Sequence, residues 1–495
     1  MLEIKPYQFW FVTGSQHLYG EEALREVEKH SVEMVEGLNE KGNFPYTIQF
    51  KSVVTTSTEI ENLMMAANQD DHCAGVITWM HTFSPAKLWI AGLNSLKKPL
   101  LHLHTQYNQN IPWDSIDMDF MNLNQAAHGD REYGFMVTRL RVPRKVVVGY
   151  WESKEVFEKV SSWMQTAVAF TEGKNIRVAR FGDNMRNVAV TDGDKVEAQI
   201  KFGWVVDYYG IGDLVEVIHA IPEEEVENLF NEYNRLYDFP DESSANGKLQ
   251  ESIKEQARIE LGLKRFLTSK NYNAFTTNFE DLHGMKQLPG LAVQRLMADG
   301  YGFAGEGDWR TAALLRMMKV IANNKGTSFM EDYTYHLEQG NETVLGSHML
   351  EICPTVAATK PKVVVNPLSM GDREDPARLV FDGRGGDAVV ASLVELGGRY
   401  RLVINEVKAE QPTIDTPNLP VAKVLWKPEP SLAGSAEAWI YAGGAHHTVF
   451  SFTVSTEQLY DFADMAQIEC VVIDEDTNVR QFRNELKWNE VVWRK

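Results

Sequence analysis

The sequence predicts an α/β protein in which two mixed α/β domains are followed by a third domain of mainly antiparallel strands. In the first third of the chain, strand-like apolar runs alternate with helical stretches, which is typical of a parallel sheet with helices on both faces. After about Asn324, short apolar runs are split by Gly, Pro and Asp, which indicates an antiparallel sheet or barrel. A chain of 495 residues also exceeds what one hydrophobic core supports, so several domains are expected.

The N-terminal region is predicted to be a Rossmann-like domain. Its strands are expected at Gln8–Gly14, His72–Met80, Pro99–Thr105 and Lys145–Trp151. Its helices are expected at Glu21–Leu38, after Ser84 as an N-cap with Pro85 at the first helical position, and at Ser153–Thr171. A short polar break at 172–175 ends this domain, which we assign to residues 1–174.

The remaining chain divides into a mixed α/β domain, residues 175–325, and a β-rich domain, residues 326–495. The middle domain is expected to contain strands at Ile176–Gly182 and Tyr272–Thr277 and helices at Gly247–Leu267, Leu291–Asp299 and Asp308–Ala322. Short strands are expected in the last domain at Val363–Asn366, Ala377–Phe381, Ala388–Leu393, Tyr400–Asn405, Ala438–Ala442 and Thr448–Val454.

Charge and composition exclude several classes of function. The net charge is −20 and no basic block occurs, so we expect no nucleic-acid partner. No apolar run approaches the ~18 residues that a membrane span requires, and the N-terminus lacks the pattern of a secretory leader. Cys73, Cys353 and Cys470 are odd in number and widely spaced, which fits a reducing, cytoplasmic environment.

Polar loops follow several predicted strands, at the edge where parallel sheets bind ligands. The loop from Thr13 to Gly20 offers Gln16, His17 and Tyr19 but lacks the G-x-G-x-x-G pattern, so no nucleotide cofactor is expected. Similar loops are Met118–Gly129, Phe181–Arg186 and Asn278–Asp281. Amide, imidazole and phenol groups suit sugar hydroxyls, and a solvated helix cap or a structural hydrogen-bond network is the alternative.

Four segments later in the chain carry acids and imidazoles that suit a metal. Glu306 lies between two glycines, and Asp308 is a candidate N-cap for the helix that begins at Trp309. The other three segments contain Glu331 with Asp332, His348 in an apolar run, and His446 with His447 on a glycine turn between predicted strands. Such ligands suit Mn²⁺, Co²⁺ or Fe²⁺, and a more oxygen-rich shell suits Mg²⁺. Spacing does not join the four segments, and each has a structural alternative: helix cap, surface acid, core histidine or hairpin turn.

Long and unusual stretches occur in all three regions, from Phe11 to Ser451. They read FVTGSQHLYG, HTFSPAKLWI, PWDSIDMDFMNLNQAAHG, FGDNMR, VAVTDGDKVEAQIKFG, FTTNFEDLHGMKQLPGLAVQRLM, YGFAGEGDWRTAALLR, TSFMEDYTYHLEQGN, VLGSHMLEICP and AWIYAGGAHHTVFS. These stretches strongly resemble bacterial L-arabinose isomerases, and the resemblance covers essentially the whole chain. It implies N-terminal and central α/β domains and a C-terminal β-barrel-like domain.

The resemblance also implies an activity and a site. Members of the family interconvert L-arabinose and L-ribulose with Mn²⁺ or a similar ion such as Co²⁺ or Mg²⁺, and many also convert D-galactose to D-tagatose. The metal ligands carry over to Glu306, Glu331, His348 and His447. The sugar contacts carry over to Gln16, Leu18, Tyr19, Phe83, Gln125, His128, Met185 and Phe279, with a further position near Met370. The family forms homo-oligomers, hexamers of paired trimers or tetramers, with sites between subunits.

This chemistry gives the two acids a role. Aldose–ketose isomerisation moves a proton between C2 and C1 through a cis-enediol, which needs a base and stabilisation of charge on oxygen. We expect Glu306 and Glu331 to be catalytic, one for the carbon proton and the other for the hydroxyl proton, in either order. The alternatives are a metal-dependent epimerase, a related isomerase acting on fucose, or a catalytically silent sugar-binding module.

Overall fold

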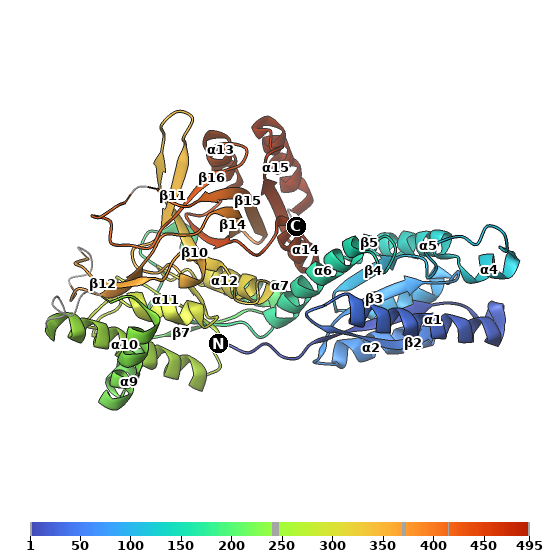
Figure 1. Cartoon of the computed structure of the whole chain (residues 1–495), viewed down its shortest axis with the longest axis horizontal. Coiled ribbons are helices and arrows are strands. Elements are labelled where there is room, and N and C mark those ends of the chain that lie inside the picture. Colours follow the sequence, from blue (N-terminus) through green and yellow to red (C-terminus); the bar gives the residue numbers. More distant parts are fainter. Residues whose placement is uncertain (1, 240–246, 369–372, 414, 494–495) are drawn as a thin grey trace. The chain divides into compact units, whose positions relative to one another are not determined.

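The computed structural model describes residues 2–239, 247–368, 373–413 and 415–493. The chain forms two compact units (Figure 1). The N-terminal unit is Ile4–Thr171 with Asp464–Gln467, and the larger unit contains Glu172–Ala463 and the segments before Ile4 and after Gln467. Each unit has its own sheets and core, and each is described separately.

The N-terminal unit is built on five parallel strands, as the alternating pattern predicts. Their spatial order is β2 (Thr47–Val54), β1 (Gln8–Gly14), β3 (Cys73–Met80), β4 (Leu100–His104) and β5 (Lys145–Val148). All eight residues of β3 are buried, because a parallel sheet is covered on both faces. The strand order reverses between β1 and β3, and such a switch point opens a crevice at the carboxyl ends of the strands.

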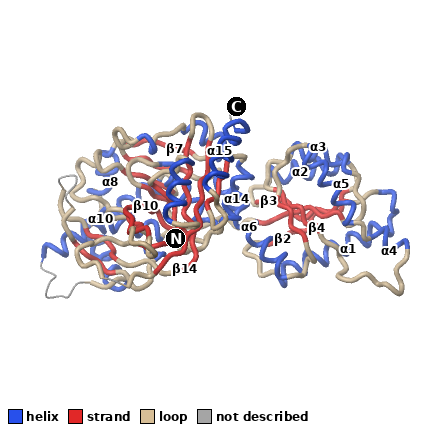
Figure 2. The backbone as a smooth tube through the Cα atoms, turned by 90° about the horizontal axis from the view of Figure 1, so that it is seen from above, coloured by secondary structure: helices blue, strands red, loops and turns tan. Residues whose placement is uncertain are grey.

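Helices cover both faces of this sheet (Figure 2). They are α1 (Gly20–Lys41), α2 (Ser57–Gln69), α3 (Ile90–Ser95), α4 (Met118–Leu123), α5 (Ala126–Arg139) and α6 (Lys154–Gly173). Alternate residues of β1 point to opposite faces, so Phe9 contacts Trp163 of α6 and Trp10 joins the core formed with α2 and α5. The expected cap at Ser84 is wrong. A 3₁₀ turn, Ala86–Trp89, precedes α3, and the Ser84 hydroxyl instead accepts a hydrogen bond from the Trp89 indole (3.0 Å).

The first part of the larger unit contains four parallel strands. Their order is β7 (Val205–Tyr209), β6 (Arg177–Phe181), β8 (Ala274–Thr277) and β9 (Gly302–Ala304). The helices of this part are α7 (Lys195–Phe202), α8 (Ile211–His219), α9 (Glu223–Leu236), α10 (Gly247–Ser269), α11 (Gly290–Ala298) and α12 (Trp309–Ile321). The strand order reverses between β6 and β8, which creates a second switch point.

The rest of the larger unit contains a closed six-stranded antiparallel barrel. Around the barrel the strands are β14 (Gly386–Glu395), β17 (His447–Ser451), β10 (Thr327–His336), β11 (Thr343–Ser347), β16 (Val424–Pro428) and β15 (Tyr400–Glu410), which pairs with β14 again. A parallel strand, β18 (Glu469–Ile473), adds to β15, and β12 (Lys362–Val365) pairs with β13 (Ala377–Val380). The α/β and barrel-like fold predictions are therefore confirmed.

The strand expected at Ala438–Ala442 is wrong, because these residues end a helix, α13 (Leu432–Ala442). The Ser431 side chain accepts a hydrogen bond from the Gly434 amide at its start, and Gly443 (φ 75°) ends it in the left-handed conformation. Two further helices, α14 (Thr456–Ala466) and α15 (Val479–Trp493), were not predicted. The two neighbouring histidines therefore follow a helix end and not a hairpin turn.

Helix α12 packs between the central sheet and the barrel, and all 13 of its residues are buried. Its three cationic side chains donate to carbonyl oxygens: Arg310 to Val190, Arg316 to Gly300 (3.0 Å) and Lys319 to Thr327 (3.0 Å). Burial of these cations is therefore compensated by hydrogen bonds.

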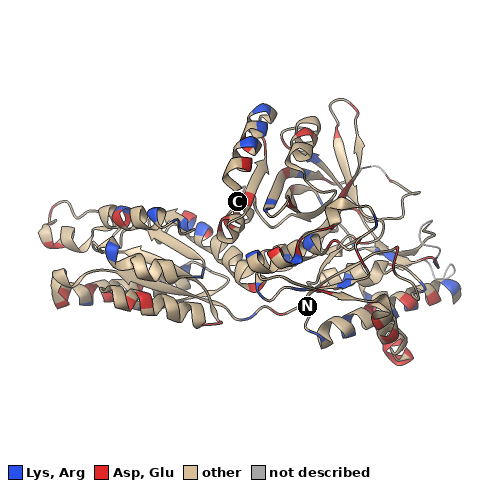
Figure 3. Cartoon of the chain, turned by 180° about the vertical axis from the view of Figure 1, so that it is seen from behind, with Lys and Arg blue, Asp and Glu red and all other residues tan. Residues whose placement is uncertain are grey.

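Elsewhere both signs of charge occur on the same helices, such as α10 and α15 (Figure 3). Within the described ranges, the helices are all too short or too polar to cross a membrane.

A substitution at Gly346 on β11 would test how closely the barrel is packed. A Cβ atom at this position would overlap the buried ring of Trp426 on the neighbouring strand. We expect Gly346→Ala to destabilise the protein by about 1–3 kcal/mol, measured by urea unfolding. The control is Gly212→Ala in α8, where a Cβ atom meets no atom within 4 Å, so stability should stay equal or rise. Equal losses in both variants would contradict the packing argument.

Candidate functional site

Glu306 lies in the loop directly after β9, at the carboxyl edge of the central sheet. Its backbone has φ 61°, a left-handed conformation that is uncommon for a glutamate. The Met185 amide donates to its carbonyl (3.0 Å) and holds the loop. Added Cβ atoms would lie 3.0 Å from His348 Cε1 at Gly305 and 2.7 Å from the Asn184 Cα at Gly307. Because both flanking residues are glycines, His348 and Asn184 can lie close to the backbone of this loop.

Glu306 meets two consecutive histidines at the start of β17. Its Oε2 lies 3.6 Å from His446 Nε2 and 3.9 Å from His447 Nε2. One ligand atom from each of these three residues falls within 4.8 Å of the others. Burial tends to raise the pKa of Glu306, but the histidines outweigh it and hold the pKa below its ordinary value. The carboxylate is therefore ionised at neutral pH.

The other two predicted metal ligands lie beside this group, on neighbouring barrel strands. Glu331 on β10 is in register with His447 on one side and with Ser347, next to His348, on the other. The imidazole rings of His348 and His447 are 5.7 Å apart, and Phe329 packs against both. The tight three-residue group found in the described residues includes neither Glu331 nor His348. The structure thus gathers the predicted four residues in one region and adds His446 to them.

Both predicted metal-binding histidines are oriented by buried carboxylates. His447 Nδ1 lies 3.2 Å from Asp308 Oδ2, and His348 Nδ1 lies 2.6 Å from Glu351 Oε2. A histidine whose Nδ1–H donates to a carboxylate presents a lone pair at Nε2, which is the usual arrangement around protein-bound metals. His447 is fully buried, and its Nε2 has no hydrogen-bond partner among the residues that the structure describes. These observations fit a divalent cation at this position.

Asp308 and Glu351 were not predicted to have this orienting role, and His446 was not predicted as a site residue. The N-cap prediction for Asp308 is confirmed, since its Oδ1 accepts from the Thr311 amide (3.1 Å). The spacing of Glu351, three residues after His348, is the signal that could have identified it. His446 carried no signal beyond its place next to His447.

Two predicted sugar-contacting residues lie in the larger unit, on loops that follow neighbouring strands of the central sheet. Met185 follows β6 and is bonded to the Glu306 loop, and Phe279 follows β8. Arg186 joins these loops by ion pairs with Glu280 (3.2 Å) and Asp281 (3.1 Å). The position near Met370 falls outside the described residues.

The other six predicted sugar contacts lie in the N-terminal unit, near the switch point of its sheet. They are Gln16, Leu18, Tyr19, Phe83, Gln125 and His128. The Tyr19 hydroxyl donates to Gln125 Oε1 (3.0 Å), and the rings of Phe83 and His128 stack at 5.4 Å. The Leu18 side chain is 84% exposed. The structure therefore groups the predicted sugar contacts into two sets, one in each unit.

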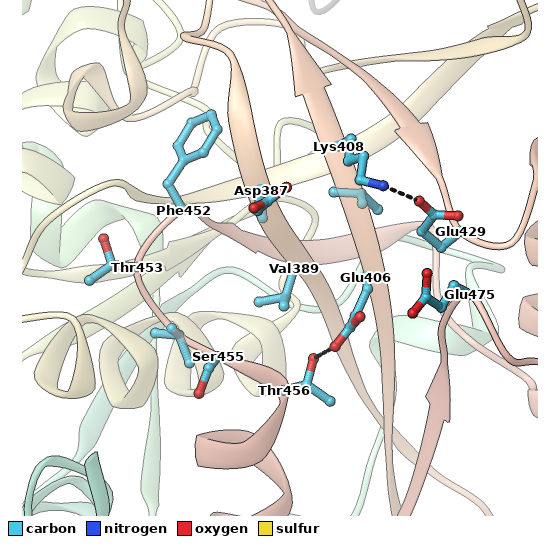
Figure 4. A pocket seen from close by; sticks show the side chains of 13 residues that line it. Asp387, Val389, Glu406, Lys408, Glu429, Phe452, Thr453, Ser455, Thr456 and Glu475 are labelled. Atoms are coloured by element: carbon cyan, nitrogen blue, oxygen red, sulfur yellow. Dashed lines mark hydrogen bonds and ion pairs between the residues drawn. The ribbon is translucent and has the colours of Figure 1, made fainter. Parts of the chain in front are cut away.

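A hollow of about 470 Å³ formed by β14, β15 and the start of α14 contains none of the predicted residues (Figure 4). The acids Asp387, Glu406, Glu429 and Glu475 line it. Lys408 pairs with Glu429 (2.9 Å), and the Thr456 hydroxyl donates to Glu406 (2.6 Å). Such a partly paired acidic surface is expected of a chain with net charge −20 and indicates no particular ligand.

A histidine pair, with His81 buried and His30 partly buried, lies beneath the loops of the N-terminal unit that carry predicted sugar contacts. His81 directly precedes the Thr82–Phe83 loop, and its carbonyl accepts from the Gln125 amide (2.9 Å). His81 Nε2 lies 2.8 Å from His30 Nδ1. Burial lowers the pKa of His81 to about 3. The ring is therefore neutral throughout the physiological range.

We expect the His81 ring signals to stay constant in an NMR titration from pH 8 to pH 5. A lowered pKa means that the ring protonates only when the pH falls towards about 3, because the charged form is not solvated in the core. A blocked histidine amide in the same buffer serves as the reference and should titrate fully. A His81 midpoint near that of the reference would contradict the burial argument.

Comparison with known proteins identifies the family of this chain. Models of the N-terminal, central and C-terminal domains of L-arabinose isomerase match residues 3–175, 177–324 and 326–469. The chain is 68% identical to L-arabinose isomerase of Geobacillus stearothermophilus, across 100% of both chains. It is 64% identical to the enzyme of that name from Halalkalibacterium halodurans, across 99% of both chains. It is 61% identical to that of Bacillus subtilis, across 100% of this chain and 99% of the relative.

These matches extend over all the segments that carry the candidate site, and the chain belongs to the L-arabinose isomerase family.

Proposed function

We propose that this chain interconverts L-arabinose and L-ribulose, an aldose and its 2-ketose, in the cytoplasm. The observation that carries the proposal is the buried, unpartnered Nε2 of His447 beside Glu306, in a chain that matches L-arabinose isomerases along its whole length. The odd number of widely spaced cysteines supports a reducing compartment.

Glu306, Glu331, His348 and His447 would hold a divalent cation, with Mn²⁺ as our first choice and Co²⁺ or Mg²⁺ as substitutes. Bound there, the ion would supply Lewis-acid stabilisation of the negative charge that develops on sugar oxygens. The carboxylates of Asp308 and Glu351 occupy the Nδ1 sides of the two histidines, so that both rings present Nε2. No nucleotide cofactor is needed, because the reaction has no net change of oxidation state.

The two glutamates would carry the protons. In the forward direction a base removes the proton from C2, a cis-enediol forms, and a proton is delivered to C1 while the O2 proton moves to O1. Glu306 lies in the loop after β9 and Glu331 lies on β10, so the two carboxylates are held by different elements. One takes the carbon proton and the other the hydroxyl proton. The lowered pKa of Glu306 keeps it ionised, as a base requires.

The sugar would be held by both sets of predicted contacts. Gln16, Gln125 and His128 offer polar groups for hydroxyls, while aromatic rings such as Phe83 pack on C–H faces. The family resemblance supports a homo-oligomer, a hexamer of paired trimers or a tetramer, with sites between subunits. D-galactose, which differs from L-arabinose by one hydroxymethyl group, would be converted to D-tagatose as a side reaction.

We expect Glu306→Ala and Glu331→Ala each to lower L-ribulose formation from L-arabinose by about 1,000-fold or more, since each removes a proton-transfer group and a metal ligand. The measurement is a ketose assay with added Mn²⁺, with circular dichroism as the check on folding. Glu338→Ala, an exposed acid on the β10–β11 hairpin, is the control and should retain activity.

The alternatives predict other outcomes of the same assay. Turnover of fucose without L-ribulose would reject L-arabinose as the substrate. A silent binding module would form no ketose although it is folded and binds sugar. Both alanine variants would then leave its sugar binding unchanged.

We further expect Asp308→Asn and Glu351→Gln to weaken Mn²⁺ binding about 10–100-fold, measured by calorimetric titration. Both changes keep the shape of the side chain but remove the charge that orients a histidine. Asparagine is also a good N-cap, so the Asp308→Asn variant should still begin α12 and keep its fold. The matched control is Asp194→Asn, the same change at the N-cap of α7. If Asp194→Asn weakens Mn²⁺ binding equally, Asp308 and Glu351 do not act by orienting the histidines.

A further inference from the structure

A second concave site lies in the N-terminal unit, beside the N-terminus of α5. It is a hollow of about 370 Å³ at the carboxyl ends of β4 and β5, lined also by residues of α4 and α5. Its size suits a small molecule, and this edge of a parallel sheet is where such ligands bind. The predicted sugar contacts are not among its lining residues.

The lining of this hollow is polar but almost free of charge. Five carboxamides contribute to it, Gln106, Asn108, Gln109, Asn110 and Asn124. Of the described residues that line it, none is Asp, Glu, Lys or Arg, although 24% of the chain is charged. A phosphate or carboxylate would need a cation here, and a cationic ligand would need an acid. Amides both donate and accept hydrogen bonds, as hydroxyl groups do.

Two further features of the lining suit a sugar-like compound. Phe120 and Tyr150 provide rings that can pack on C–H groups. His104 provides an imidazole whose Nδ1 lies 2.7 Å from the buried Asp130, which also lies 2.7 Å from His102 Nε2. The hydrogen bond to Asp130 raises the pKa of His104, and the paired Asp130 carboxylate neutralises the charge of the protonated ring. Asp130 thus orients the ring and leaves its Nε2 edge as a defined polar group.

Three of the five amides are already held by hydrogen bonds within the protein. Gln106 Nε2 donates to the Asn124 carbonyl (3.0 Å), and Asn108 Nδ2 donates to Asn124 Oδ1 (3.3 Å). Asn124 directly precedes Gln125, whose Oε1 holds the Tyr19 hydroxyl. Preorganised polar groups bind a ligand at a lower entropic cost than mobile ones. The same segment connects this hollow to the predicted substrate loop.

We propose that this hollow is a second binding site, for a neutral polyhydroxyl compound such as a sugar or an alditol. This proposal rests on the chemistry of the residues that line the hollow and does not require the proposed isomerase activity. A ligand held here would contact Asn124 and the first turn of α5, next to the residues that hold the substrate loop.

The test uses the full chain with labelled valine and alanine methyl groups, titrated with L-arabinitol, which has no carbonyl to isomerise. We expect saturable NMR shifts of the Val148 and Ala126 methyl groups, which line the hollow. Asn108→Ala should raise the midpoint about tenfold, because it removes one amide. Asn62→Ala, an exposed amide on α2, is the matched control and should leave the midpoint unchanged. D-gluconate, which is charged, should produce no saturable shift.

A second variant tests the hollow without touching its amides. Val148→Trp should fill it and abolish the Ala126 shift, whereas Val146→Trp, on the same exposed side of β5 but outside the hollow, should not. Absence of saturation in the wild type, or shifts insensitive to Asn108→Ala and Val148→Trp, would overturn the proposal. L-arabinose turnover is assayed on the same samples. Saturation without turnover would reject the isomerase proposal alone, and turnover without saturation would reject this site alone.

Discussion

The arrangement of the larger unit depends on one buried carboxylate. Asp308 accepts hydrogen bonds from the Thr311 amide and hydroxyl (2.8 Å for the hydroxyl) and so begins α12. The same carboxylate contacts His447 Nδ1 on β17. Burial tends to raise the pKa of Asp308, but the contact with His447 outweighs it and the pKa stays below its ordinary value. A single ionised group therefore joins the helix between the two sheets to the imidazole of the candidate metal site.

Most of the α/β framework could be predicted, because its elements are long and have a clear apolar pattern. Strand β1 and the bounds of α6, α10 and α12 differ from prediction by at most two residues. The barrel was harder to predict, since it depends on pairing between strands that are far apart in the sequence, such as β10 and β17. The apolar run at the end of α13 was predicted to be a strand, because a short apolar run does not distinguish a strand from a helix. The cap at Ser431 and the left-handed Gly443 decide in favour of the helix.

The candidate site illustrates a different limit of sequence reasoning. Glycines around Glu306 and an apolar setting for His348 indicated unusual positions, but no spacing related one segment to another. The barrel supplies that relation, because register places Glu331 between His447 and the strand that ends before His348. Family resemblance predicted the four residues without this geometry. His446 and the carboxylate partners of the histidines emerged only when the chain was folded.

The backbone of Glu306 has a consequence for how this protein can change. A non-glycine residue at φ 61° carries a conformational penalty of about 1 kcal/mol, which glycine or asparagine would relieve. Folding energy and the proposed chemistry therefore favour different residues at this position. Selection for thermal robustness alone would tend to replace the glutamate, whereas the proposed proton-transfer role would retain it. Under the proposed function, the protein accepts a less stable fold at this position in exchange for a proton-transfer group.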